Sequence, residues 1–246
     1  RNTRRQRQMC IRDRAKALGV ATEELDLALT RAYLQTGEPQ SALELIQSSS
    51  VLNSQSSGLV LRGEALFALQ KYVDARESFQ AGLDADSTNL NARYGLIRLA
   101  LETRNLDRAA SQIGAVLKQA PGDFQGLVFQ AELALGRNQP EQAVEAYRQA
   151  LNVRDGLLVR LGLARALLAA GNPDAADAEI ARVLEQAPEH LPALYLKAVS
   201  ASQREDYDGA KSQLQAVLAK SPEHYPSMLL LGAIQYNLGE YEQAIN

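Results

Sequence analysis

The chain has no tryptophan, a single cysteine and no long apolar run. With only Cys10 present, an intrachain disulfide is excluded and cysteine usage does not indicate a redox compartment. The longest apolar stretch, Met228 to Ile234, is far shorter than the roughly 20 residues that a membrane-spanning helix needs. Valine, isoleucine and threonine form no alternating runs, whereas alanine, leucine, glutamine, glutamate and arginine dominate. This composition favours helices, and 46% apolar residues suffice for a sizeable buried core.

Basic charge is concentrated at the N-terminus. Residues 1–14 hold six of the 26 basic residues and one of the 29 acidic ones, so that 20 basic and 28 acidic residues follow. The lysines and arginines of this acidic remainder are dispersed along the predicted helices. We therefore expect no nucleic-acid partner, because such a surface lacks the clustered positive charge that phosphates require.

The first fourteen residues differ in character from the rest. They lack an initiator methionine, an apolar segment and the small residues of a signal cleavage site, and Cys10 is not preceded by a lipidation motif. The segment resembles translated sequencing-adapter read-through, so we interpret residues 1–14 as a non-native tail. The alternative is a genuine basic tail. Residues 15–22 are typical of the end of a preceding helix, which suggests that the chain is also cut at its start.

A period of 33 or 34 residues runs through the remainder. It is marked by alanines that fall late in each unit, which are Ala42, Ala75, Ala109, Ala143, Ala176, Ala210 and Ala244. With these alanines at position twenty of each unit, the units start at Glu23, Ser56, Leu90, Phe124, Leu157, Leu191 and Tyr225. The last unit stops at Asn246, partway through its second helix. We expect about six and a half repeats and a chain that is a fragment of a longer protein.

Other positions fall into columns in the same register. Position eight is small in five of seven units, which lets two antiparallel helices approach closely. Position twenty-four carries a bulky residue in every complete unit, namely Ile46, Phe79, Ile113, Tyr147, Ile180 and Leu214. Glycines such as Gly37 and Gly171 fall at the turn inside a hairpin, and prolines such as Pro188 fall between hairpins.

The columns hold small residues at positions eight and twenty, a bulky residue at position twenty-four and prolines between hairpins, at a period of 34. Over residues 23–246 this pattern resembles the tetratricopeptide repeat family. The resemblance implies an all-α fold, a right-handed superhelical solenoid of antiparallel helix hairpins. Position four departs from the family, which usually has an aromatic residue there, because it is Asp26, Arg93 and Arg160 in three units. These charges leave the local packing in doubt.

Chemical motifs are missing. The sequence has no phosphate-binding loop, no zinc-protease motif and no nucleophile elbow. His190 and His224 end successive units at equivalent positions, which would lie about 10 Å apart, too far to share one metal ion. We interpret them as solvated loop histidines and predict no catalytic residue, cofactor site or metal site, so that the chain is not an enzyme.

The family resemblance implies that the first helix of each hairpin lines a concave groove for a protein or peptide. At the groove positions, the aromatic candidates are Tyr94 and Tyr195 (position five) and Phe67 and Tyr236 (position twelve). Each could instead pack against a neighbouring hairpin. Position nine reads Arg31, Glu64, Arg98, Glu132 and Arg165, for which we hypothesise an alternating charge ladder. Position five has no basic residue, so a clamp for acidic chaperone tails cannot form.

The sequence from the end of the fifth unit onward resembles the repeat lipoproteins of bacterial PEP-CTERM systems, which are encoded with exosortase and exopolysaccharide genes. This resemblance implies an exported scaffold at the periplasm or the outer membrane, with a lipid anchor in the full-length protein. The alternative is a cytoplasmic recognition arm of a larger enzyme or regulatory protein. A signal peptide with a lipidation cysteine, or a fused catalytic domain, would distinguish the two.

Overall fold

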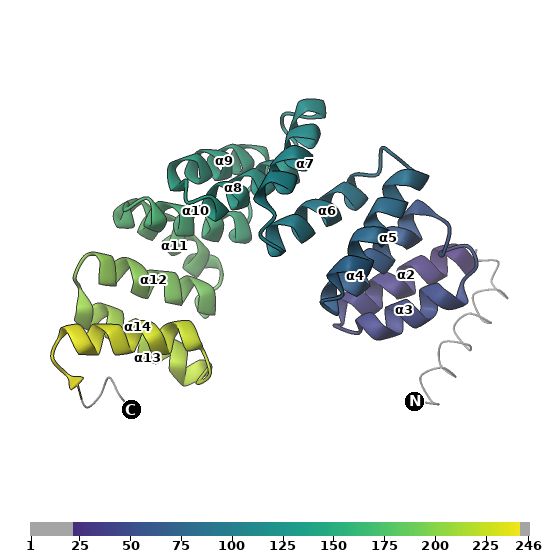
Figure 1. The fold of residues 1–246 in the computed structure, drawn as a ribbon. Helices are drawn as coiled ribbons and strands as arrows, with labels where there is room; N and C mark the ends of the chain where they lie inside the picture. Colours follow the sequence, from purple (N-terminus) through teal and green to yellow (C-terminus); the bar gives the residue numbers. More distant parts are fainter. Residues whose placement is uncertain (1–21, 242–246) are drawn as a thin grey trace. The chain divides into compact units, whose positions relative to one another are not determined.

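The computed structural model describes residues 22–241, and within that range the chain forms thirteen α-helices and no strand. The predicted tail at 1–14, and all but the last residue of the predicted helix remnant at 15–22, lie outside the described residues. The helices, shown in Figure 1, are α2 (Thr22–Gln35), α3 (Pro39–Ser48), α4 (Ser56–Ala68), α5 (Tyr72–Ala85), α6 (Leu90–Glu102), α7 (Leu106–Gln119), α8 (Phe124–Gly136), α9 (Pro140–Val153), α10 (Leu157–Ala169), α11 (Pro173–Gln186), α12 (Leu191–Gln203), α13 (Tyr207–Lys220) and α14 (Tyr225–Asn237).

The even-numbered helices are the first helices of the hairpins. Each ends in a short turn at a residue with a left-handed backbone, which closes the last helical turn before the second helix begins. In three hairpins this residue is a glycine, with φ between 72° and 77°: Gly37, Gly171 and Gly239. In four others it is a non-glycine residue with φ between 57° and 63°: Gln70, Arg104, Asn138 and Glu205. The shared geometry shows that one turn type builds every hairpin.

The chain divides into two compact units, residues 1–116 and residues 117–246, with the boundary inside α7. In the N-terminal unit, α4 contacts α2, α3, α5 and α6. In the C-terminal unit, α10 contacts α9, α11 and α12, and α12 contacts α13 and α14. Within each unit these first helices pack on their hairpin partners and on neighbouring hairpins, which is the nearest-neighbour pattern of a solenoid.

The cores consist of the predicted columns. The six described alanines at position twenty have no exposed surface, and the bulky residues at position twenty-four are at most 2% exposed. Small residues make room for them: a Cβ added at Gly63 would lie 2.6 Å from the ring of Phe79. The same ring also packs on the next hairpin, because a Cβ added at Gly95 of α6 would lie 2.4 Å from it. Phe79 therefore fills the space between neighbouring hairpins.

The charged residues at position four are accommodated. Asp26 is 4% exposed, and the Thr30 hydroxyl donates a hydrogen bond of 2.7 Å to its carbonyl oxygen. Arg93 is half-buried and donates to the carbonyl oxygen of Ser87. Arg160 forms two ion pairs, described below. The two arginines thus have polar partners for their charges.

Candidate functional site

A pocket of about 790 Å³ opens on the first helices α8, α10 and α12 of the C-terminal unit. Its volume is within the range of ligand sites in proteins. Most of its wall is apolar, contributed by Phe124, Val128, Leu158, Leu161, Tyr195 and Leu196. One of these side chains, Leu158, is 80% exposed. An apolar wall that no part of the described chain covers is a surface suited to receiving a partner's apolar side chain.

The repeat explains why these side chains meet. Positions two and five of three successive first helices all line the pocket: Gln125 and Val128, Leu158 and Leu161, Pro192 and Tyr195. Residues three apart lie on one face of a helix, so the same two positions in stacked first helices build one continuous surface. The pocket is therefore a product of the repeat register.

Three polar groups also line the pocket: Glu132, Arg165 and the Tyr147 phenol. Burial raises the pKa of the Glu132 carboxyl above its usual 4.5, and the Arg165 charge opposes this. Burial also raises the pKa of Tyr147, where the Arg165 charge acts in the opposite direction and the Glu132 charge in the same direction. The three groups thus lie close enough to interact, and they form a polar patch within an otherwise apolar wall.

Tyr147 occupies the bulky position twenty-four and is 2% exposed. Its ring lies directly against α10, because residue 162 is glycine: an added Cβ there would be 2.5 Å from Cζ of the ring. Aliphatic residues or phenylalanine fill this position in the other complete units. The tyrosine therefore serves both as a core side chain and as a hydrogen-bonding group in the pocket.

The loop after α9 forms the rim. The Arg154 guanidinium lies 3.8 Å from the centre of the Phe124 ring, a cation–π arrangement. Arg160 pairs with Asp155 at 2.7 Å and with Glu179 at 2.6 Å, and Glu179 also pairs with Arg182 at 2.8 Å.

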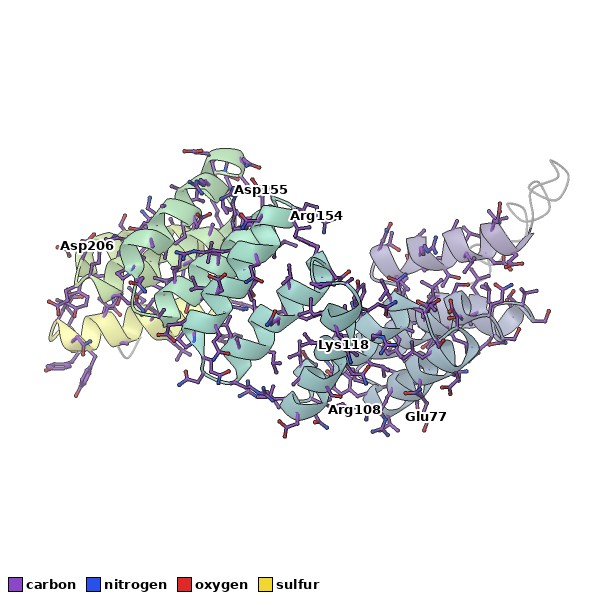
Figure 2. All side chains as sticks on the ribbon, turned by 90° about the horizontal axis from the view of Figure 1, so that it is seen from above. Glu77, Arg108, Lys118, Arg154, Asp155 and Asp206 are labelled. Atoms are coloured by element: carbon purple, nitrogen blue, oxygen red, sulfur yellow. The ribbon has the colours of Figure 1, made fainter. Side chains whose placement is uncertain are left out.

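This network fixes the loop that carries Arg154, which Figure 2 shows at the surface at the end of α9. The hydrogen bond from Arg160 holds the pKa of Asp155 below its usual range.

The N-terminal unit brings four predicted residues together. Burial raises the pKa of the Glu64 carboxyl, while the charges of Arg98 and Arg31 lower it. The Arg98 guanidinium also lies 5.0 Å from the centre of the Phe67 ring. Position nine therefore couples its charges electrostatically between successive first helices in this unit, as it does for Glu132 and Arg165 in the other.

The remaining predicted aromatics differ in their surroundings. Tyr195 lines the pocket, and its ring centre lies 5.3 Å from that of His224. Tyr94 is half-buried on α6. Tyr236 is 64% exposed, stacks edge-on with Tyr241 and does not line the pocket.

The pocket residues that sequence reasoning missed include Phe124, Tyr147, Arg154 and Leu158. Leu158 could have been predicted from the sequence, because position two is a groove position and holds a large apolar residue only in that unit.

The interpretation of the histidines as solvated loop residues was wrong. Both are half-buried and directly precede first helices, His190 before α12 and His224 before α14. Only the His224 side chain caps its helix, because His190 makes no side-chain capping hydrogen bond. Nδ1 of His224 accepts a hydrogen bond from the Ser227 amide and lies 2.7 Å from the Ser227 hydroxyl. A histidine can replace the usual serine or aspartate at a helix start, because its unprotonated ring nitrogen accepts from the amides there.

No group of three histidine, cysteine, aspartate or glutamate side chains within residues 22–241 is placed to hold a metal ion. None of the described helices combines the length and the apolar composition needed to cross a membrane.

Solved structures share the fold at low sequence identity. A tetratricopeptide repeat protein from Parabacteroides merdae is 18% identical, covers 90% of this chain and 88% of its own, and superposes with a TM-score of 0.71. PilW, described as a type IV pilus biogenesis factor, is 18% identical, with coverages of 80% and 89% and a TM-score of 0.69. YrrB, described as a repeat protein with an unusual peptide-binding site, is 18% identical, with coverages of 76% and 95% and a TM-score of 0.54.

A curated relative, the Protein CTR9 homolog of Arabidopsis thaliana, is 25% identical over 142 residues. The match takes in 57% of this chain but 13% of that protein's length. Family models described as Tetratricopeptide repeat match residues 27–89, 66–133, 134–199 and 201–246, which is nearly the whole described range. With the helices, turns and core columns in agreement, the chain belongs to the tetratricopeptide repeat family of protein-binding solenoids.

Proposed function

We propose that the chain is a non-catalytic scaffold that binds a protein segment in the pocket of its C-terminal unit, and that it serves envelope or exopolysaccharide assembly in bacteria. The observation that carries the binding function is the continuous wall built by positions two and five of α8, α10 and α12, with Leu158 80% exposed. Covering one leucine side chain fully contributes about 1.5 to 3 kcal/mol, so this wall can supply a binding hot spot.

The resemblance of the last two units and the preceding loop to repeat lipoproteins of PEP-CTERM systems supports the envelope setting. The fold shared with a type IV pilus biogenesis factor is compatible with it. In this setting the full-length protein carries a lipid anchor and works in the periplasm or at the outer membrane. The charges at position nine, including Arg98 and Arg165, set the polarity of the inner surface and disfavour wrong ligands.

Pull-down from bacterial envelope and cytosolic extracts, with the captured proteins identified by mass spectrometry, tests the proposal. The bait variants change the inner surface of each unit, Arg98→Glu and Leu158→Asp. Matched controls place the same changes elsewhere on the same units, Arg62→Glu and Val153→Asp, at exposed residues outside the pocket. We expect envelope or polysaccharide-export proteins to bind the wild type and both controls but not Leu158→Asp, and we expect Arg98→Glu to capture a different set of proteins. Equal capture by all baits would contradict binding at the inner surface.

A second candidate is a recognition arm of a larger cytoplasmic enzyme or regulatory protein. The observation that favours it is the match to a curated relative of which this chain covers 13%, a much longer protein. Capture of cytosolic proteins alone, still dependent on Leu158, would support this candidate and argue against the envelope setting.

A further inference from the structure

One of the four charged residues that line the pocket of the C-terminal unit lacks a partner of opposite charge in the described part of the chain. Among the charged residues that line it, the Glu132 carboxyl interacts with Arg165, and the Asp155 carboxylate is paired with Arg160. Within residues 22–241 no carboxylate pairs with Arg154, which is held instead over the Phe124 ring. A ligand therefore meets an apolar wall with one uncompensated guanidinium at its rim.

From this arrangement we propose that the occupant is a segment of a partner protein in which an acidic side chain adjoins a bulky apolar side chain. The inference rests on the proposed function and names the chemistry of its ligand. The apolar side chain packs on Leu158, Leu161 and Tyr195 in the pocket, and the carboxylate pairs with Arg154 at the rim. A guanidinium offers a planar, forked set of donors that matches a carboxylate.

A purely apolar segment fits less well. Covering Phe124 would remove water from the guanidinium above it, and a charge that loses water without gaining a partner opposes binding. A basic segment fits less well too, because both carboxylates of the pocket already interact with arginines. A segment with both an acidic and an apolar side chain covers the apolar wall and supplies a carboxylate to Arg154 at the rim.

The position of Arg154 is itself fixed, which makes it a suitable recognition group. It follows α9 directly, its amide donates to the Ala150 carbonyl at 2.9 Å, and the next residue is tied to Arg160. A guanidinium held by the ring below it and by the loop around it has less freedom to lose when a carboxylate binds.

Selection from a phage-displayed library of random 12-residue peptides on the immobilised full chain tests the inference without assuming a sequence. We expect the enriched peptides to carry an acidic residue within two positions of a phenylalanine, leucine, tyrosine or tryptophan. Synthetic copies, capped at both ends so that only the side chain supplies a carboxylate, should bind at low salt and lose affinity as salt rises. Replacing the acid by its amide should weaken binding by about tenfold.

Variants of the chain distinguish a failure of this inference from a failure of the proposed binding function. Arg154→Glu should weaken the capped peptides by at least about tenfold and should make the amide-substituted peptides no weaker than the acidic ones. Arg148→Glu, the same charge change on the exposed side of α9, should leave binding unchanged.

Two results would overturn the inference and still support binding in the pocket. In the first, the enriched peptides lack acidic residues. In the second, they bind Arg154→Glu as well as the wild type, while Leu158→Asp abolishes binding. No enrichment, or binding indifferent to Leu158→Asp, would overturn both.

Discussion

Gly162 on α10 should not tolerate a methyl group, although alanine is the better helix former. A Cβ at this position would lie 2.5, 2.6 and 2.8 Å from Cζ, Cε1 and Oη of Tyr147. Normal contacts between such atoms are about 3.5 to 4.0 Å, so the ring must shift by about 1 Å. Tyr147 is 2% exposed and packed in the core, so overpacking should cost about 1 to 3 kcal/mol.

Gly114 on α7 is the matched control, because a Cβ there would meet nothing within 4 Å. Gly114→Ala should therefore show only the helix-propensity gain, a stabilisation of about 1 kcal/mol. Gly162→Ala includes the same gain and the steric cost, so it should be less stable than Gly114→Ala by about 1 to 3 kcal/mol.

Urea unfolding followed by circular dichroism would measure both variants, with the slope checked because repeat arrays can unfold in more than one step. In a Tyr147→Leu background the ring atoms are gone, and Gly162→Ala should become neutral or stabilising. If Gly162→Ala stabilises the wild-type chain as much as Gly114→Ala does, the proposed packing of Tyr147 on α10 is refuted.

Three further predictions concern the same unit. Ala176→Leu should destabilise the chain by about 1 to 3 kcal/mol, because Ala176 is fully buried. Ala175→Leu, at the exposed neighbouring position, should change the free energy of unfolding by no more than about 0.5 kcal/mol. Equal urea midpoints for the two variants would show that the register is wrong.

Glu132→Gln should raise the urea midpoint at pH 7. The folded-state pKa of Glu132 is raised, so the wild type loses stability as pH rises above 4.5, and the gain should vanish near pH 4; a gain independent of pH would contradict this cause. Arg160→Met should lower the free energy of unfolding by about 1 to 3 kcal/mol, because it removes a partner from the Glu179 carboxylate, which is 13% exposed. An unchanged urea midpoint in low salt would show that the ion pairs of Arg160 contribute nothing to stability.

The repeat made the fold predictable from sequence. The columns at positions twenty and twenty-four identify the buried side chains, and first helices begin at Ser56, Leu90 and Phe124, where the register places the unit starts. Because seven units define the register together, a local exception such as Arg160 does not obscure it. A single unit with such an exception would not identify the repeat. The capping role of His224 was missed because a side-chain cap depends on the backbone geometry at one residue.

The site was predictable only in part. Glu132, Arg165 and Tyr195 follow from groove positions in the repeat, and the pocket contains them. Arg154 lies outside every groove position, in the loop after α9, and its placement over Phe124 depends on the path of that loop. Tyr147 follows the core pattern, and only the structure shows that it lies against Gly162 and lines the pocket.

Photo-crosslinking from the pocket tests the central claim most directly. Benzoylphenylalanine would replace Leu158 in one sample and Arg148, which is exposed and outside the pocket, in another. After irradiation with a bacterial envelope extract, mass spectrometry would map the crosslinked partner segments. The account predicts a defined partner segment joined at position 158 and none at position 148. The same proteins crosslinked equally from both positions, or no adduct from position 158, would contradict it.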